Sequence, residues 1–484
     1  MLIIASYGCA GLKNISSEDP LFIGNEFKLI DGGKKVKRYI REASNYIQPV
    51  PNGQLLWMRP ALALNNMLSD SAKKKKFWKN KVEEPVQLSQ TSPHKAGKSL
   101  QNRIFHEGFF GNSITFDTIR VGKKKAKYRY KITLNDPFRF GSIVFPEPKD
   151  DLTENIGLSQ QSSLLKTGDL YSLETIKNER KRIDKFLKDR GYIYFNPEFI
   201  FLQADSMSDD HVVNIKVLVK PETPPESRIP FTIGKIYLLD DYSLYNYSPD
   251  TLDLDPFFLL SENNNLKFEA LKRGVFLEPG QPYSYTNHLQ TIRYLNNLPI
   301  IKSTSMKFST GEQEDQLNTV LYLTKNKRHA YSAEFNAIFR STNYFGPGAI
   351  LSYSNRNARH GGEQLKINLR GRFEIQIADG TVNPAYELGL DVNYRLAGLH
   401  PAFLKKLGKR WLPQTTISVG YNLFYRLDLY QLNSIFMDFG YRWNKKGVIS
   451  HKYNPAEIIF TRIPESSISD EFRDYLEENP GLRS

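Results

Sequence analysis

The residues with the most recognisable chemistry are a Gly-Lys-Ser triplet and eight histidines. Residues 97–99 match the end of a phosphate-binding loop, but that loop needs a glycine five positions before Gly97. Ser92 occupies that position, so we reject a nucleotide site. The histidines show no metal-ligand spacing, and we expect His94, His106 and His288 to be surface or helix residues. The sequence therefore predicts no catalytic group, no cofactor and no metal.

Cys9 is the only cysteine of the chain, so neither an intrachain disulfide nor a multi-cysteine zinc site can form. A short apolar run ending in Gly8 precedes it, an arrangement that resembles the signal of a bacterial lipoprotein. In such proteins the cysteine carries acyl chains that tether the exported protein to a membrane. The run has no basic segment before it, and Tyr7 is bulky for its position. We expect lipidation at Cys9; the alternative is an incidental cysteine in a frayed N-terminus.

A chain of 484 residues, 40% of them hydrophobic, is long enough for three or four domains with sizeable cores. Its formal charge of +14 suits an anionic membrane surface or nucleic acid, and equally a solvated basic surface. No aromatic-basic stacking motif recurs, which argues against nucleic acid. The lysines at 73–76 are expected to form a solvated face or to touch anionic head groups. The sequence contains no run of 18 apolar residues, so it predicts no transmembrane helix.

Residues 328–463 contain seven segments, most of which alternate apolar and polar side chains, as β-strands with two different faces do. In residues 365–377 every second residue is Leu, Ile, Gly or Phe, and those between are charged or amides. Residues 386–396 repeat the pattern. Each segment has about 11 residues or more, the reach that a tilted strand needs to cross a bilayer. We predict the wall of an antiparallel transmembrane β-barrel, apolar toward lipid and polar toward a lumen.

The first barrel strand, residues 331–340, is predicted to form one side of a barrel seam. Its lipid-facing residues are Ala333, Phe335, Ala337 and Phe339. Its lumenal residues are Ser332, Glu334, Asn336 and Ile338. Further lumenal charges are predicted at Asp391, Arg395, Asp438 and Arg442. Aromatic residues are predicted to form interfacial belts or, alternatively, ordinary strand packing: Tyr353, Tyr394, Tyr421, Tyr425, Tyr441 and Trp443.

Seven strands are too few to close an even-stranded bacterial barrel, and two open edges would face lipid. The sequence also ends in polar residues at 479–484, without a terminal aromatic strand. We therefore expect a fragment or a product cut short, and we expect that it cannot insert as a monomer.

Upstream of this stretch, a unit of one strand, helical material and a two-stranded hairpin occurs three times. The second unit has a strand at 140–145, helices at 158–165 and 173–190, and hairpin strands at 195–203 and 212–219. The third has a strand at 231–236, a helix through 289–298, and hairpin strands at 300–308 and 317–324. The first has a strand near 27–30, a helix at 35–46, an insertion at 48–92, and hairpin strands at 113–121 and 127–134.

Three such α+β units followed by a membrane barrel resemble the BamA/TamA outer-membrane assembly superfamily (bacterial surface antigen family) with its periplasmic POTRA repeats. With the N-terminal cysteine, the chain resembles a TamA-like lipoprotein of Bacteroidetes type, C-terminally truncated. The domains are then a lipoprotein signal remnant and linker at 1–20, POTRA-like units at 21–136, 137–222 and 229–325, and barrel at 326–484. The Arg-Gly-Phe-type motif of the family's barrels is not found, since residues 370–373 are Arg-Gly-Arg-Phe.

The resemblance implies an outer-membrane protein assembly or translocation factor and not an enzyme. Unfolded outer-membrane protein clients would add a strand at the POTRA edges 195–203 and 300–308 and enter at the barrel seam. The implied partners are the outer-membrane lipid bilayer, these clients and a TamB-like inner-membrane partner, with the N-terminal domains in the periplasm. A passive outer-membrane transport or adhesion barrel with periplasmic domains is the alternative.

Overall fold

The computed structural model of the chain describes most of its residues. These are residues 12, 14–30, 50–54, 59–68, 81–207, 210–240, 242, 250–261, 266–339, 344–378, 381–400, 413–427, 429–445 and 449–478. Cys9, the predicted helix at 35–46 and the lysines at 73–76 lie outside them. The chain forms two compact units, Met1–Leu187 with Phe195–Pro225 and Lys188–Tyr194 with Glu226–Ser484.

The first α/β unit has a three-stranded sheet with the order β1-β3-β2. Its elements are β1 (Leu21–Leu29), α3 (Pro60–Met67), η1 (Leu88–Gln90), α6 (Pro93–Phe105), β2 (Ser113–Arg120) and β3 (Lys125–Thr133). Every second side chain of β3 is buried, and Ile132 packs against Leu100 and Ile104 of α6. The predicted hairpin matches β2 and β3 to within two residues at each end. The strand predicted near residue 27 starts earlier, at Leu21.

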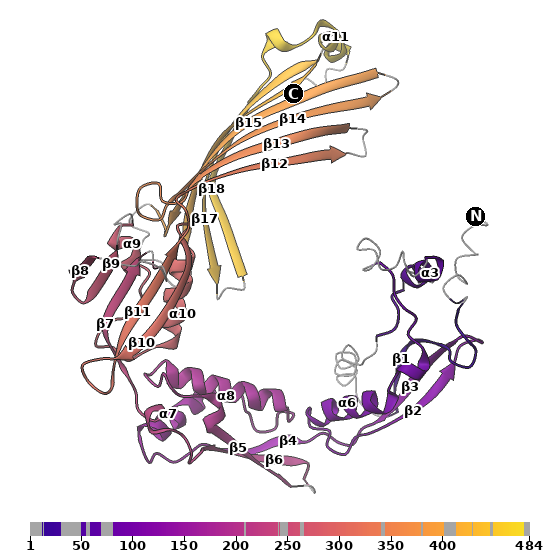
Figure 1. Cartoon of the computed structure of the whole chain (residues 1–484), viewed down its shortest axis with the longest axis vertical. Coiled ribbons are helices and arrows are strands. Elements are labelled where there is room, and N and C mark those ends of the chain that lie inside the picture. Colours follow the sequence, from indigo (N-terminus) through magenta and orange to yellow (C-terminus); the bar gives the residue numbers. More distant parts are fainter. Residues whose placement is uncertain are drawn as a thin grey trace. The chain divides into compact units, whose positions relative to one another are not determined.

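The second α/β unit repeats this topology with the strand order β4-β6-β5. Its elements are β4 (Arg139–Val144), α7 (Asp151–Leu158), η2 (Ser159–Ser162), α8 (Leu173–Lys188), η3 (Pro197–Phe199), β5 (Ile200–Met207) and β6 (Val212–Val219). The long helix α8 (Figure 1) buries Ile176, Ile183 and Leu187, one stripe of its surface.

Two predicted boundaries in the second unit are wrong. The helical stretch predicted at 158–165 contains only the last residue of α7 and the 3-10 turn η2, because the α-helix itself lies before it, at Asp151–Leu158. Asp150 starts α7 by accepting a hydrogen bond from Thr153 N (2.9 Å), and Thr153 Oγ1 accepts from Asp150 N, a cap that apolar spacing does not reveal. The hairpin strand predicted from residue 195 begins at Ile200, because Asn196 and Pro197 start the 3-10 turn η3.

The third α/β unit has a five-stranded sheet with the order β10-β11-β7-β9-β8, two strands more than we predicted. Its elements are η4 (Pro225–Ser227), β7 (Thr232–Asp240), β8 (Asp250–Leu254), β9 (Phe257–Ser261), α9 (Phe268–Lys272), α10 (Tyr285–Asn296), β10 (Ile301–Thr310) and β11 (Gln316–Lys325). The β8–β9 hairpin extends the sheet beyond β7. Its strands are short and every residue of β8 is exposed, so neither strand shows a long amphipathic pattern.

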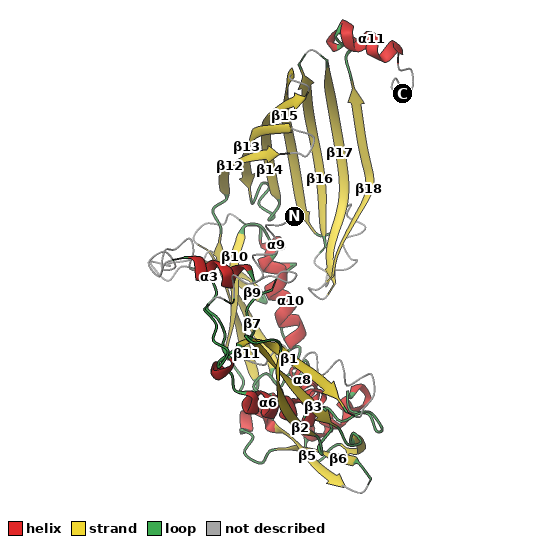
Figure 2. Ribbon diagram, turned by 90° about the vertical axis from the view of Figure 1, so that its right-hand side faces the viewer, coloured by secondary structure: helices red, strands yellow, loops and turns green. Residues whose placement is uncertain are grey.

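The seven predicted barrel strands form one antiparallel sheet in sequence order (Figure 2). The strands are β12 (His329–Phe339), β13 (Tyr344–Asn355), β14 (Gln364–Ala378), β15 (Thr381–Ala397), β16 (Gln414–Arg426), β17 (Tyr430–Lys445) and β18 (Ile449–Arg462). A 3-10 turn, η7 (Glu465–Ser467), and α11 (Asp470–Glu478) follow. Within the described ranges β12 and β18 do not pair with each other, so the sheet is not closed. The predicted fold class is confirmed.

Among the residues that the structure describes, no helix is both long and apolar enough to cross a membrane.

Candidate functional site

One face of the seven-stranded sheet is apolar from edge to edge. The register places one residue from each strand side by side in a single row. The row is Ala333, Leu351, Leu369, Leu390, Tyr421, Ile435 and Phe460. Its large side chains are exposed, Phe460 by 62%. A continuous apolar surface of this kind marks a contact with lipid or protein, because soluble monomers rarely leave one uncovered.

Aromatic side chains of this face lie toward both strand ends. At one end Tyr331 packs on Tyr353 of the next strand, with ring centroids 5.3 Å apart. At the other end Phe339 packs on Phe345 (4.8 Å), and a second pair there is Tyr386 and Tyr425 (4.9 Å). Of the six aromatic residues predicted to form interfacial belts, only Tyr421 lies in the row that runs from Ala333 to Phe460.

The opposite face of the sheet is rich in charge. Arg370 pairs with Asp391 across β14 and β15 (3.0 Å), and Arg372 pairs with Glu387 (2.9 Å). Asp438 accepts a hydrogen bond from Asn454 (2.6 Å). The register puts all four predicted lumenal charges on this face. Phe436 and Ile459 lie there too, against the pattern that we predicted.

The strand β12 is an edge of the sheet and exposes the four predicted seam residues. Ala333, Phe335, Ala337 and Phe339 are all exposed, with Phe335 at 82%. They lie on the apolar face, and Ser332, Glu334, Asn336 and Ile338 lie on the other. Among the residues that the structure describes, β12 pairs only with β13, and alanine alternates with phenylalanine on its apolar face. Its role as a seam stays a prediction.

Each α/β unit leaves the first strand of its hairpin at an edge of its sheet. These edge strands are β2, β5 and β10. The edges predicted at 195–203 and 300–308 correspond to β5 and β10, with the boundaries now Ile200–Met207 and Ile301–Thr310. On β5, the side chain of Phe201 is 45% exposed at this edge of the sheet. The edge at β2 was not predicted, although its hairpin was.

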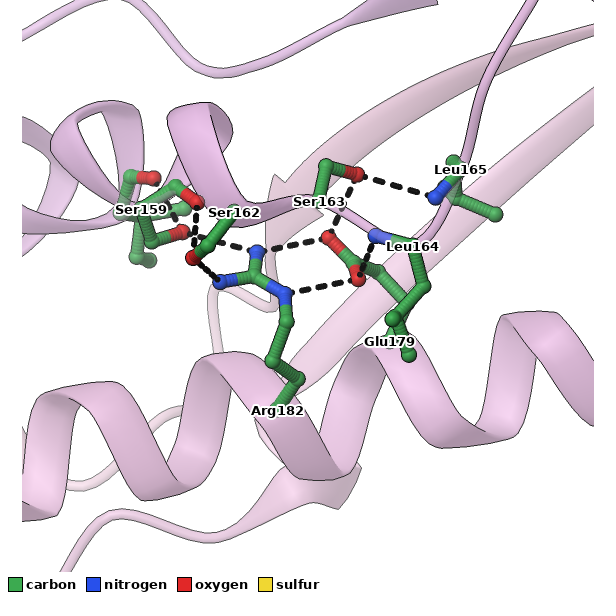
Figure 3. A network of polar contacts seen from close by, with 8 residues as sticks. Ser159, Ser162, Ser163, Leu164, Leu165, Glu179 and Arg182 are labelled. Atoms are coloured by element: carbon green, nitrogen blue, oxygen red, sulfur yellow. Dashed lines mark hydrogen bonds and ion pairs between the residues drawn. The ribbon is translucent and has the colours of Figure 1, made fainter.

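A buried ion pair links two segments of the second unit (Figure 3). Glu179 of α8 has no exposed surface and accepts two hydrogen bonds from Arg182, at 2.7 and 2.8 Å. The Glu179 carboxylate also accepts bonds from Ser163 Oγ and Leu164 N, both 2.9 Å. Arg182 in turn donates to Ser162 Oγ (2.8 Å). The network ties α8 to the segment after α7, a link that no sequence pattern indicated.

The residues first considered for chemistry have structural roles. Residues 97–99 lie inside α6, and Gly97 packs on the ring of Tyr130, so they form no phosphate loop. His94 is exposed on α6, and His106 follows that helix. His288 on α10 hydrogen-bonds the Tyr283 hydroxyl (2.9 Å), and burial lowers its pKa. In the described part of the chain, no group of three His, Cys, Asp or Glu side chains could hold a metal ion.

No protein-family model matches this chain. No curated protein matches it either. Several solved structures show similarity to it, among them these three. POTRA domains 3–5 of BamA from Haemophilus influenzae share 11% identity with it over 63% of this chain and 96% of that chain, with a TM-score of 0.32. BamA from Haemophilus ducreyi lacking POTRA domains 1–3 shares 12% identity with it over 68% of this chain and 64% of that chain, with a TM-score of 0.33. CdiB from Acinetobacter baumannii shares 10% identity with it over 69% of this chain and 63% of that chain, with a TM-score of 0.26. The last two are each matched over less than two thirds of their length.

Proposed function

We propose that this chain belongs to an outer-membrane factor that assembles or translocates β-barrel or secreted proteins. The observation that carries the proposal is the union of three α/β units with open sheet edges and a long-stranded sheet with one apolar and one charged face. In lipid every backbone N–H and C=O group must be paired, so such a sheet suits a membrane as part of a barrel wall. The aromatic pairs near both strand ends suit the two membrane interfaces.

Client recognition in this proposal takes place at β5 and β10. An extended client segment adds to such an edge through main-chain hydrogen bonds, which depend little on its sequence. This mode suits a factor that handles many unfolded outer-membrane proteins.

Client entry in this proposal takes place at β12. The alanines at 333 and 337 give β12 less apolar surface than larger side chains at these two positions would, so we take the strand to be held less firmly in lipid and suited to exchange partners at a seam. The four exposed residues Ala333, Phe335, Ala337 and Phe339 would face lipid there. No chemical step is assigned to the chain.

The proposed location is the outer membrane, with the three α/β units in the periplasm. A lipid on Cys9 would add a second tether, and a TamB-like inner-membrane protein is a proposed partner. Labelling with radioactive palmitate tests the tether: we expect label on the wild type and none on Cys9→Ala. Label that persists on Cys9→Ala would refute lipidation at this residue.

A passive transport or adhesion barrel is the second candidate, favoured by the ion pairs Arg370–Asp391 and Arg372–Glu387, which suit a water-filled lumen. Depletion of the protein separates the two functions. We expect the levels of other outer-membrane proteins to fall when it is depleted. Unchanged levels, together with reduced uptake of a small solute, would favour passive transport instead.

A further inference from the structure

The third α/β unit and the seven-stranded sheet are joined by three residues, and each is bonded to a neighbour. Asn326 donates three hydrogen bonds, of 2.7 to 3.3 Å, to the carbonyl oxygens of residues 299–301 at the start of β10. On the sheet side, Arg356 donates from its backbone to Arg328 O (2.8 Å) and from its side chain to Lys327 O (2.9 Å). The short connection is therefore fixed from both directions.

The turn between β13 and β14, residues 356–363, is closed on itself. Asn357 is buried, with 1% of its surface exposed, and its Oδ1 accepts a hydrogen bond from Gly362 N (3.0 Å). Across the same turn, Ala358 N donates to Glu363 O (3.0 Å). A buried side chain that bonds the backbone of its own turn holds that turn in one shape.

This turn also contacts the third α/β unit at two points. Lys267 N, just before α9, donates to His360 O (2.7 Å). His360 has a φ of 64°, a left-handed conformation that costs free energy at a residue other than glycine. Gly362 has a φ of 79°, and a Cβ added there would lie 3.2 Å from Leu298 Cδ2 in the core of the unit. Both unusual conformations therefore occur where the turn meets the unit.

We propose that residues 356–363 form a clamp that holds the third α/β unit and the sheet in one fixed geometry, with Asn357, His360 and Gly362 as positioning residues. The edge strand β10 pairs with β11, which leads through the fixed connection directly into β12. The clamp thus keeps the proposed client edge at a constant place relative to the proposed seam. This consequence rests on the proposed function, whereas the clamp itself does not.

Distance measurements between spin labels test the clamp. Ser305→Cys on β10 and Ser332→Cys on β12 supply exposed labels in a Cys9→Ser chain, purified whole in detergent. Gly362→Ala introduces backbone strain and crowds Leu298, and we expect the distance distribution to broaden. Gly280→Ala is the matched control, because Gly280 has a nearly equal φ of 78° and open space around its added Cβ. We expect its distribution to stay narrow.

A second variant covers the case in which Gly362→Ala does not fold. Lys267→Pro removes the N–H that bonds His360 O together with the lysine side chain, and the φ of −58° at Lys267 already suits proline. We expect it to broaden the distribution, whereas Lys267→Ala, which keeps the N–H, should not. An unchanged distribution in Lys267→Pro overturns the clamp.

Folding of a client barrel into liposomes then tests the consequence. We expect the variants with broadened distances to lower the yield of folded client. A full yield from them would show that the fixed geometry is not used. A wild-type chain that folds no client would refute the proposed function and leave the distance result standing.

Discussion

The ring of Phe436 on β17 lies over Gly420 on β16, on the charged face of the sheet. The two residues are directly opposite each other in the register, and a Cβ added at Gly420 would overlap the ring. An aromatic ring that covers a strand glycine fixes the register of the two strands. The register matters here because a slip by one residue would exchange the apolar and the charged face.

Gly420→Ala is therefore expected to destabilise the sheet. The added methyl group must displace the Phe436 ring, and overpacking of this kind costs roughly 1–3 kcal/mol. Denaturant unfolding of the chain in detergent measures the loss. Gly371→Ala is the control, because its added Cβ would lie 3.8 Å from Leu388 Cδ2, an ordinary contact. Equal losses in the two variants would contradict the role of the ring.

Glu179→Gln is expected to loosen the second α/β unit. It would remove the charge that Arg182 pairs with in a buried site, and breaking such a pair costs about 3–5 kcal/mol. Hydrogen exchange of the α8 amides should speed up in this variant. Lys181→Ala on the exposed side of the same helix should leave exchange unchanged. Protection at wild-type level in Glu179→Gln would contradict the structural role of the network.

Stability of the first α/β unit should depend on pH through Glu26. Hydrogen bonds from Lys127 and Arg129 lower the pKa of Glu26 from 4.5 to about 2. Because the folded pKa is the lower one, the stabilisation is complete above pH 4.5 and is lost as pH falls toward about 2.

The matching variant is Glu26→Gln, which has no carboxyl group to titrate. We expect its melting temperature to lie below that of the wild type at pH 7 and to converge with it at low pH. Carbon NMR of the Glu26 carboxyl gives the pKa directly, and Lys127→Met should raise that pKa. A difference in melting temperature that stays constant with pH would contradict the assignment.

Phe201→Asp on the edge strand β5 should weaken client binding several-fold. The substitution would leave the backbone edge in place but remove an exposed apolar contact beside it. Cross-linking of an unfolded outer-membrane protein to β5 measures the effect. Leu158→Asp is the control, since Leu158 is 55% exposed on α7 and lies outside the sheet. Equal cross-linking in all three proteins would show that the Phe201 side chain does not contribute to client binding, and no cross-linking to β5 in the wild type would exclude β5 as a client edge.

Replacing Ala333 and Ala337 together by leucine should slow client insertion. Each substitution would add apolar surface to the lipid-facing side of β12, and its burial in lipid would contribute about 2 kcal/mol. The strand would therefore be held more firmly. The rate at which a client barrel folds in liposomes measures this. Leu351→Ile on β13 should leave the rate unchanged. Faster insertion by the double variant would contradict the weak-seam role of β12.

The alternation of apolar and polar side chains in the sequence determined the strands of this protein and the faces of its long sheet. It predicted seven strands in sequence order and the face of nearly every residue in them, because the two faces of a strand follow from its geometry alone. It also placed the hairpins of the three α/β units, and β6 at Val212–Val219 matches the predicted bounds. Patterns within one continuous segment were sufficient for these features.

Only the tertiary structure determined the features that join distant segments. The β8–β9 hairpin, which was not predicted, is stabilised by pairing with β7 and not by its own pattern. Phe436 meets Gly420 sixteen positions away, and His360 meets Lys267 across more than ninety. Such contacts leave no periodic signal, because each depends on where the folded chain brings two unrelated residues together.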